Sequence, residues 1–68
     1  MEDRDRLPII IRHWIEHNKS HLEEYSRWGQ RAEELGWERV KVKITGAMEK
    51  LSQSNSCLEE ALKELESV

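Results

Sequence analysis

Apolar side chains in the first half of the chain recur at spacings of three and four residues, which is the repeat of an α-helix. The stripe comprises Leu7, Ile10 or Ile11, Trp14, Asn18, His21, Tyr25, Trp28, Ala32 and Leu35. Pro8 suits the first turn of a helix, and an aspartate before it can cap the start. Gly36 follows the stripe and suits the left-handed backbone just past a helix end. The pattern predicts a first helix over about residues 7–35, with a turn at 36–37.

The second half carries a similar stripe with one irregular stretch. Its members are Trp37, Val40, Ile44, Ala47, Met48, Leu51, Asn55, Leu58, Leu62 and Leu65. Residues 40–46 alternate between apolar and polar, as an edge strand does. A lone strand would have no sheet to join, and the helical pattern continues on both sides. We therefore expect a second helix over about residues 38–66, with Gly46 as a weak point.

A short turn between two long helices predicts an antiparallel hairpin, so residues 1–68 form one all-α domain. Centring the turn between Gly36 and Trp37 makes the numbers of facing residues sum to about 73. Asn18 then lies opposite Asn55, and each interrupts its own apolar stripe. A buried asparagine pair can specify helix alignment. Because the stripes are too wide for one hairpin to cover, we expect a homodimer that forms a four-helix bundle.

Composition narrows the class of protein. A chain of 68 residues buries a small core, so it needs tight packing, a partner subunit or a metal. The net charge is -3 and no basic stripe is present, which argues against nucleic acid as a partner. No apolar run approaches the roughly 20 residues that span a bilayer. We expect a cytoplasmic protein without a membrane partner. No phosphate-binding loop or nucleophile elbow is present, so we do not expect an enzyme.

All three histidines of the chain lie within nine residues, at a strict spacing of four. On a helix His13, His17 and His21 step round by about 40° at a time, from the outer surface toward the apolar stripe. Neighbouring rings can converge on a metal, whereas the outer two are about 12 Å apart along the axis. One pair with a carboxylate such as Glu24, or with a second chain, is the better ligand set. We therefore expect a site for a divalent transition metal such as nickel, cobalt or zinc.

Two other interpretations account for the same pattern. The histidines can be packed and hydrogen-bonded within a dimerisation or protein-interaction module that holds no metal. Alternatively, protonation of His21 near pH 6 loosens the bundle and acts as a pH-sensitive switch.

The segment HWIEHNKSH, followed by Tyr25 and Trp28, resembles a small prokaryotic helical-hairpin domain with the motif HWxxHNxxHxxxYxxW. The resemblance covers residues 7–65, and its specific part is confined to the first helix. Such domains occur alone or beside proteins that handle nickel or cobalt. The resemblance implies metal binding or delivery, with His13, His17 and His21 at the matching positions and a metal-handling protein as a partner.

Overall fold

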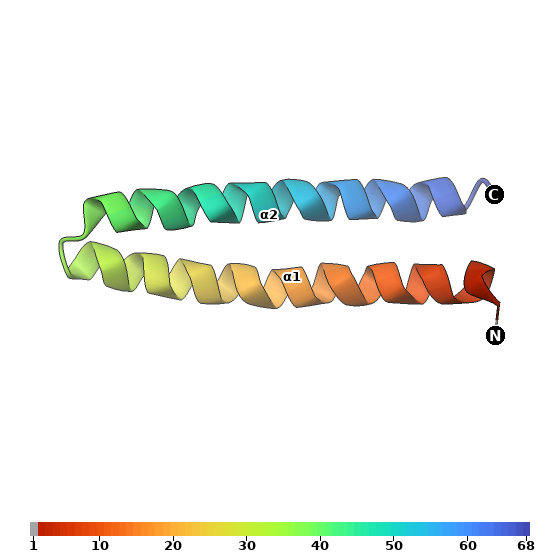
Figure 1. The fold of residues 1–68 in the computed structure, drawn as a ribbon, viewed down its shortest axis with the longest axis horizontal. Helices are drawn as coiled ribbons and strands as arrows, with labels where there is room; N and C mark the ends of the chain where they lie inside the picture. The colour runs from red at the N-terminus through yellow and green to blue at the C-terminus, as the bar shows by residue number, and fades with distance from the viewer. Residues whose placement is uncertain (1) are drawn as a thin grey trace.

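Two long helices and no strand make up residues 2–68, which the computed structural model of the chain describes. Helix α1 spans Asp3–Glu34 and helix α2 spans Glu38–Leu65. They run antiparallel, side by side, and both ends of the chain lie opposite the turn (Figure 1). The hairpin is long and flat, with extents of 50 × 18 × 11 Å. The prediction of an all-α hairpin is confirmed over these residues.

Backbone hydrogen bonds explain why α1 stops where it does. Gly36 adopts a φ of +78°, in the left-handed region that only glycine enters without strain. The N–H of Gly36 then donates to the carbonyl of Glu33 at 3.0 Å, and the N–H of Trp37 donates to that of Ala32 at 2.9 Å. This pair of bonds is the Schellman motif, which satisfies carbonyls at the helix end. The chain therefore reverses within three residues, and α2 starts directly beside α1.

The N-terminal helix begins earlier than the apolar pattern predicts. It starts at Asp3 and not near residue 7, so Pro8 lies inside the helix and not in its first turn. Proline has no N–H, so the carbonyl of Arg4 loses its helical partner. Asp3 and Asp5 oppose that loss, because negative charge in the first turn stabilises the positive end of the helix dipole. Residues 40–46 are helical, so their strand-like alternation is misleading.

A seam of strict heptads joins the two helices. Its α1 members are Pro8, Ile11, Ile15, Asn18, Leu22, Tyr25, Gly29 and Ala32; its α2 members are Lys41, Ile44, Met48, Leu51, Asn55, Leu58, Leu62 and Leu65. Both sets alternate spacings of three and four, as in an antiparallel coiled coil. The side chains of Asn18 and Asn55 meet across the seam. A Cβ on Gly29 would lie 3.5 Å from Cγ2 of Ile44. In each of these pairs the two residue numbers sum to 73, which confirms the predicted register.

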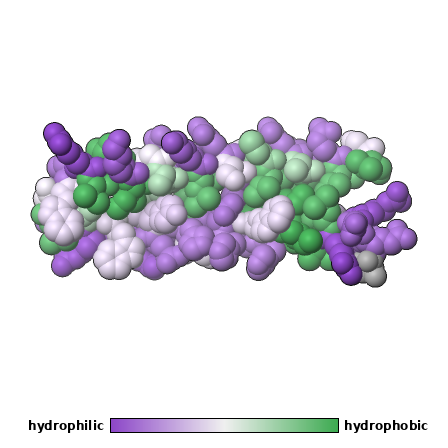
Figure 2. All heavy atoms as spheres, viewed as in Figure 1, coloured by the Kyte–Doolittle hydropathy of each residue, from purple (hydrophilic) through white to green (hydrophobic). Residues whose placement is uncertain are grey.

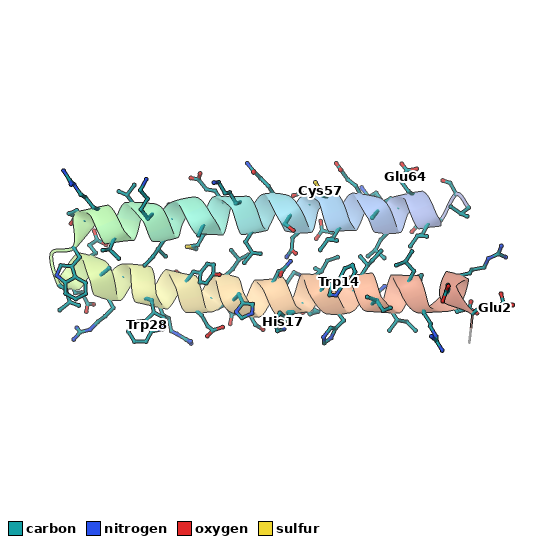
Figure 3. All side chains as sticks on the ribbon, viewed as in Figure 1. Glu2, Trp14, His17, Trp28, Cys57 and Glu64 are labelled. Carbon is teal, nitrogen blue, oxygen red and sulfur yellow. The ribbon has the colours of Figure 1, made fainter. Side chains whose placement is uncertain are left out.

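The buried face of α1 is rotated from the predicted stripe. Ile15 is only 6% exposed and Gly29 is buried, whereas Trp14 is 47% and Trp28 is 64% exposed. Figure 3 shows the Trp28 side chain projecting from α1 away from α2. Two neighbouring rows of α1 are apolar, and the row with Gly29 and Ala32 allows a closer approach of the backbones. The seam therefore takes that row and leaves the tryptophans outside.

A single hairpin covers little of its apolar surface. The buried apolar side chains among residues 2–68 are Ile11, Ile15 and Ala32. Large apolar side chains that remain exposed are Leu7, Ile9, Ile10, Trp14, Tyr25, Trp28, Leu35, Trp37, Val40, Val42 and Val68. Figure 2 shows apolar patches over the open end and along α2, between polar edges. Neither helix of the described residues combines the length and apolarity needed to cross a membrane.

Candidate metal centre

The imidazoles of His17 and His21 meet on the flank of the seam. Their Nε2 atoms are 2.9 Å apart, and the two rings are nearly perpendicular, with an angle of 83° and centroids 4.4 Å apart. Residues four apart on a helix lie one above the other, so the backbone itself brings the rings together. Figure 3 labels His17 near the middle of α1. The approach of two Nε2 atoms is the central feature of this surface.

Glu24 contacts the other ring nitrogen of His21. Its Oε1 atom lies 2.9 Å from Nδ1 of His21. An ionised carboxylate can only accept, so Nδ1 of His21 carries the hydrogen. In the neutral ring Nε2 then holds a lone pair, which accepts a hydrogen bond from the Nε2–H of His17. The carboxylate therefore fixes the tautomer of His21 and turns its basic nitrogen toward His17.

His13 stands apart from this cluster. The centre of its ring lies 6.1 Å from that of His17, at an interplanar angle of 31°. The structure therefore brings together His17, His21 and Glu24 and leaves His13 one turn away. Within residues 2–68, no three histidine, cysteine, aspartate or glutamate side chains are arranged to hold a metal ion. One chain thus offers two converging nitrogens and lacks a complete ligand set.

The cluster is open to solvent and bounded by an aromatic ring. The side chains of His21 and Glu24 are 41% and 50% exposed. The ring of Tyr25 stacks on that of His21 at a centroid distance of 6.3 Å and an angle of 29°. Sequence reasoning assigned Tyr25 to the apolar stripe and missed this contact. Its spacing of four from His21 was the available signal.

Chemically, the two Nε2 atoms are close to the geometry of a metal chelate. Nitrogen ligands bind zinc at about 2.0–2.1 Å, so two tetrahedral ligands lie about 3.3 Å apart. The observed 2.9 Å separation needs an opening of only about 0.4 Å to admit an ion in place of the shared hydrogen. Glu24 contacts the non-ligating nitrogen of His21, where carboxylates commonly orient metal-bound histidines. Its position is that of a supporting residue more than of a ligand.

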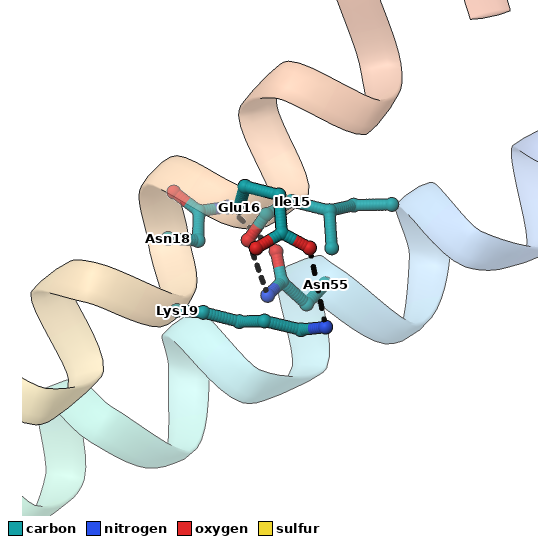
Figure 4. Close-up of polar contacts among 5 residues, drawn as sticks. All are labelled: Ile15, Glu16, Asn18, Lys19 and Asn55. Atoms are coloured by element: carbon teal, nitrogen blue, oxygen red, sulfur yellow. Dashed lines mark hydrogen bonds and ion pairs between the residues drawn. The ribbon is translucent and has the colours of Figure 1, made fainter.

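Asn18 and Asn55, next to the histidine row, are hydrogen-bonded across the seam and take no part in the cluster. Nδ2 of Asn18 donates to Oδ1 of Asn55 at 2.8 Å, and Nδ2 of Asn55 donates to the carbonyl of Ile15 at 3.2 Å. Figure 4 shows this group beside the ion pair of Lys19 and Glu16. The asparagines hold the two helices in register one residue from His17. They position the histidine row through the backbone and do not contact it.

Comparison with known proteins identifies a family. Residues 7–65 match the family described as a domain of unknown function (DUF8180). An uncharacterized protein of Archaeoglobus fulgidus is 33% identical over 58 residues, which cover 85% of this chain and 92% of that protein. No solved structure matches the chain. The chain therefore belongs to the DUF8180 family.

Proposed function

We propose that this protein binds a divalent transition metal ion through Nε2 of His17 and Nε2 of His21. The ion is nickel, cobalt or zinc, each of which accepts imidazole ligands. The observation that carries the proposal is the 2.9 Å approach of the two nitrogens, with Glu24 on the far side of His21. The role is storage, delivery to a metal-handling partner or sensing, in the cytoplasm and without a catalytic step. The working form is a homodimer of hairpins that packs as a four-helix bundle.

The partners of the ring nitrogens support a metal ion at this pair of histidines. A structural histidine needs one partner for each ring nitrogen. Here the Nε2–H of His17 donates to the Nε2 lone pair of His21, so only one of the two facing nitrogens presents a lone pair in this tautomer. A metal ion lets both Nε2 atoms act as ligands, while Glu24 keeps its bond to the opposite nitrogen of His21. The change from hydrogen-bonded to metal-bound needs small ring movements and a shift of the His17 proton from Nε2 to Nδ1.

The second candidate is an interaction module without a metal. The observation that favours it is the exposure of Trp14 and Trp28, which a protein partner would cover. In this case the histidines remain hydrogen-bonded to one another, and a chelator leaves the melting temperature unchanged. In the metal-binding case, added metal raises the melting temperature, because an ion that binds only the folded state stabilises it.

Calorimetric titration of untagged protein with nickel, cobalt and zinc chlorides tests the proposal. We expect His17→Ala and His21→Ala each to weaken binding by more than about tenfold, because each removes one of two ligands. His13→Ala is the matched control from the same row, and its affinity should stay close to that of the unmodified chain. Unchanged affinity in His17→Ala would refute the site. Elemental analysis of the purified protein gives an independent reading of which metal it carries.

A further inference from the structure

Every seventh residue from Leu7 to Leu35, the residue just past the end of α1, forms a largely apolar row beside the seam. The row reads Leu7, Trp14, His21, Trp28 and Leu35, which is the same order in both directions. The two leucines are 41% and 46% exposed, and the tryptophans 47% and 64%. His21, at the centre, belongs to the candidate metal site. A row that is symmetric about its middle residue matches itself when a second copy is turned end over end.

The matching row of α2 has the same property. It reads Val40, Ala47, Ser54 and Ala61, and the symmetric order is completed by Val68, just past the helix end. In an antiparallel pair of heptad helices, these two flanking rows lie on the same side of the seam. The numbers of facing seam residues sum to 73, and those of neighbouring residues in the two flanking rows sum to 75. Ser54 is therefore within two residues, or about 3 Å, of the level of His21, so the centres of the two rows lie close to one height. We call this side of the hairpin the palindromic face.

The opposite side of the hairpin is polar. The residues that flank the seam there are Arg12, Lys19, Ser26, Glu33, Thr45, Ser52, Glu59 and Glu66. One broad side is thus charged and hydroxylated, and the other carries leucine, tryptophan, valine and alanine. Apolar surface concentrated on one side indicates burial against a partner.

We propose that a second copy of this chain packs on the palindromic face, about a twofold axis perpendicular to the helices at the level of His21 and Ser54. Helix α1 then lies antiparallel to α1 of the partner, and α2 lies antiparallel to α2 of the partner. Trp14 meets the partner's Trp28, and Leu7 meets the partner's Leu35. Ala47 meets the partner's Ala61, so small residues face small residues on the α2 side. The contact is isologous, as a closed dimer requires.

Charges at the rim of the palindromic face favour this orientation. In the proposed register Lys43 lies within one residue of the level of the partner's Glu64. The other twofold arrangement packs α1 on the partner's α2. It brings Arg31 to the level of the partner's Lys43, which places like charges together, and its opposite pair, Glu24 with the partner's Lys50, only offsets that repulsion. Opposite charges across a rim fix orientation, and like charges oppose it.

The size of the palindromic face suits a stable dimer. The hairpin is about 50 Å long and 18 Å wide, so one broad side offers roughly 900 Å². Stable interfaces bury about 800 Å² per partner. A lone hairpin that buries so few apolar side chains gains little from its own core, because small chains bury a low fraction of their surface. A second copy supplies the burial that the single chain lacks.

This inference deepens the proposed function and rests on it in one respect, the metal ligands. The twofold axis passes close to His21, and His17 lies one turn away, so the Nε2 pair of each copy is centred about 3 Å along the helix from the axis. Together they present four imidazole nitrogens, the coordination number that zinc prefers. The ion is therefore shared between subunits, with one metal per two chains. The two-nitrogen site of a single chain is incomplete without the partner.

Sedimentation equilibrium of metal-free and zinc-loaded protein tests the dimer and its stoichiometry. We expect a mass of about 16 kDa, twice the 8.1 kDa of one chain, and one zinc per two chains. Trp28→Glu should give monomers. Val42→Glu is the matched control, because Val42 is 63% exposed but lies off the palindromic face, and it should stay dimeric. A dimeric Trp28→Glu variant would overturn the inference.

Cysteine cross-linking tests the axis independently of variant folding. In a Cys57→Ser background, Ser54→Cys should oxidise to a disulfide-linked dimer, because Ser54 meets its own counterpart on the axis. Ser52→Cys, on the polar side, should stay monomeric on a denaturing gel. No cross-link at position 54 would reject the axis. A monomer that binds one zinc through His17 and His21 would overturn the shared site and leave the proposed function intact. A cross-linked dimer that binds no metal would refute the proposed function and leave the interface standing.

Discussion

Asn18 donates a side-chain hydrogen bond to Asn55 across the seam, with 2.8 Å between Nδ2 and Oδ1. Asn55 is only 7% exposed and in turn donates to the backbone carbonyl of Ile15. The two amides therefore satisfy one another in a seam that is otherwise mostly apolar. Sliding one helix by a heptad would bury both amides against aliphatic side chains without partners. The pair thus selects one alignment of the hairpin.

Removing one amide should cost more than the hydrogen bond itself. We expect Asn55→Ala to lower the free energy of unfolding by about 1–3 kcal/mol, because the half-buried amide of Asn18 is left unsatisfied. Urea unfolding followed by circular dichroism measures the change. Ser56→Ala, one residue away and exposed, is the control and should alter stability by less than about 0.5 kcal/mol. Equal effects from the two substitutions would mean that the amide pair contributes nothing specific.

Replacing both amides should have the opposite effect on stability. The double variant Asn18→Leu with Asn55→Leu removes both polar groups at once, so no partner is left unsatisfied. We expect a higher urea midpoint together with loss of a single alignment or oligomeric state. Sedimentation velocity and the dispersion of amide NMR signals report that loss. A double variant that is both less stable and uniformly folded would contradict this role for the pair.

Gly46 weakens α2 at a position where a side chain has room. A Cβ built there meets no atom within 4 Å, and the backbone is helical. Alanine has a better helix propensity than glycine, so Gly46→Ala should raise the free energy of unfolding by about 0.5–1 kcal/mol. The turn residue Gly36 provides the contrast. Its Cβ also has room, but its φ is +78°, so Gly36→Ala should destabilise the protein by about 1 kcal/mol. Thermal melts of the two variants, run in parallel, should show a higher melting temperature for Gly46→Ala and a lower one for Gly36→Ala.

Much of the fold follows from local pattern. The spacing of the apolar residues predicts two helices, Gly36 predicts the turn, and the level of Asn18 and Asn55 predicts the register. These features depend on residues close in sequence or on a single reversal of the chain. The helix start at Asp3 was not predicted, because the residues between Asp3 and Leu7 are polar and carry no apolar signal.

The rotation of α1 could not be predicted from the same pattern. Rows beginning at Leu7 and at Pro8 are both helical and largely apolar, and hydrophobicity alone does not separate them. What separates them is size, since Gly29 in the second row lets Ile44 approach. The convergence of His17 with His21 follows from their spacing, whereas the direction of Glu24 toward Nδ1 depends on rotamers that the sequence does not specify.

Glu24 should tune metal affinity without being a ligand. Glu24→Gln keeps the length of the side chain but replaces the carboxylate on Nδ1 of His21 with an amide. We expect metal affinity to fall by about 10–100-fold, the usual effect of losing a supporting carboxylate, with unchanged stoichiometry. Glu23→Gln removes the same charge from the adjacent residue and should have little effect. Equal losses of affinity in the two variants would show that net charge, and not the bond to His21, sets the affinity. A changed number of bound ions would show that Glu24 is itself a ligand.

The ion pair of Lys41 and Glu33 predicts a loss of stability at high pH. Nζ of Lys41 lies 2.7 Å from Oε2 of Glu33, and this hydrogen bond raises the pKa of Lys41 above its ordinary value. The charges of Glu33 and Glu38 act in the same direction, and burial opposes them. Because the folded state holds the proton more tightly, the stabilisation is complete below the ordinary lysine pKa of about 10.4 and is lost as pH rises through the folded-state pKa. Urea unfolding between pH 8 and pH 11.5 should show the difference in stability between the unmodified chain and Glu33→Gln shrinking toward zero at the alkaline end. A difference that stays constant across that range would show that this ion pair does not depend on the charge of Lys41.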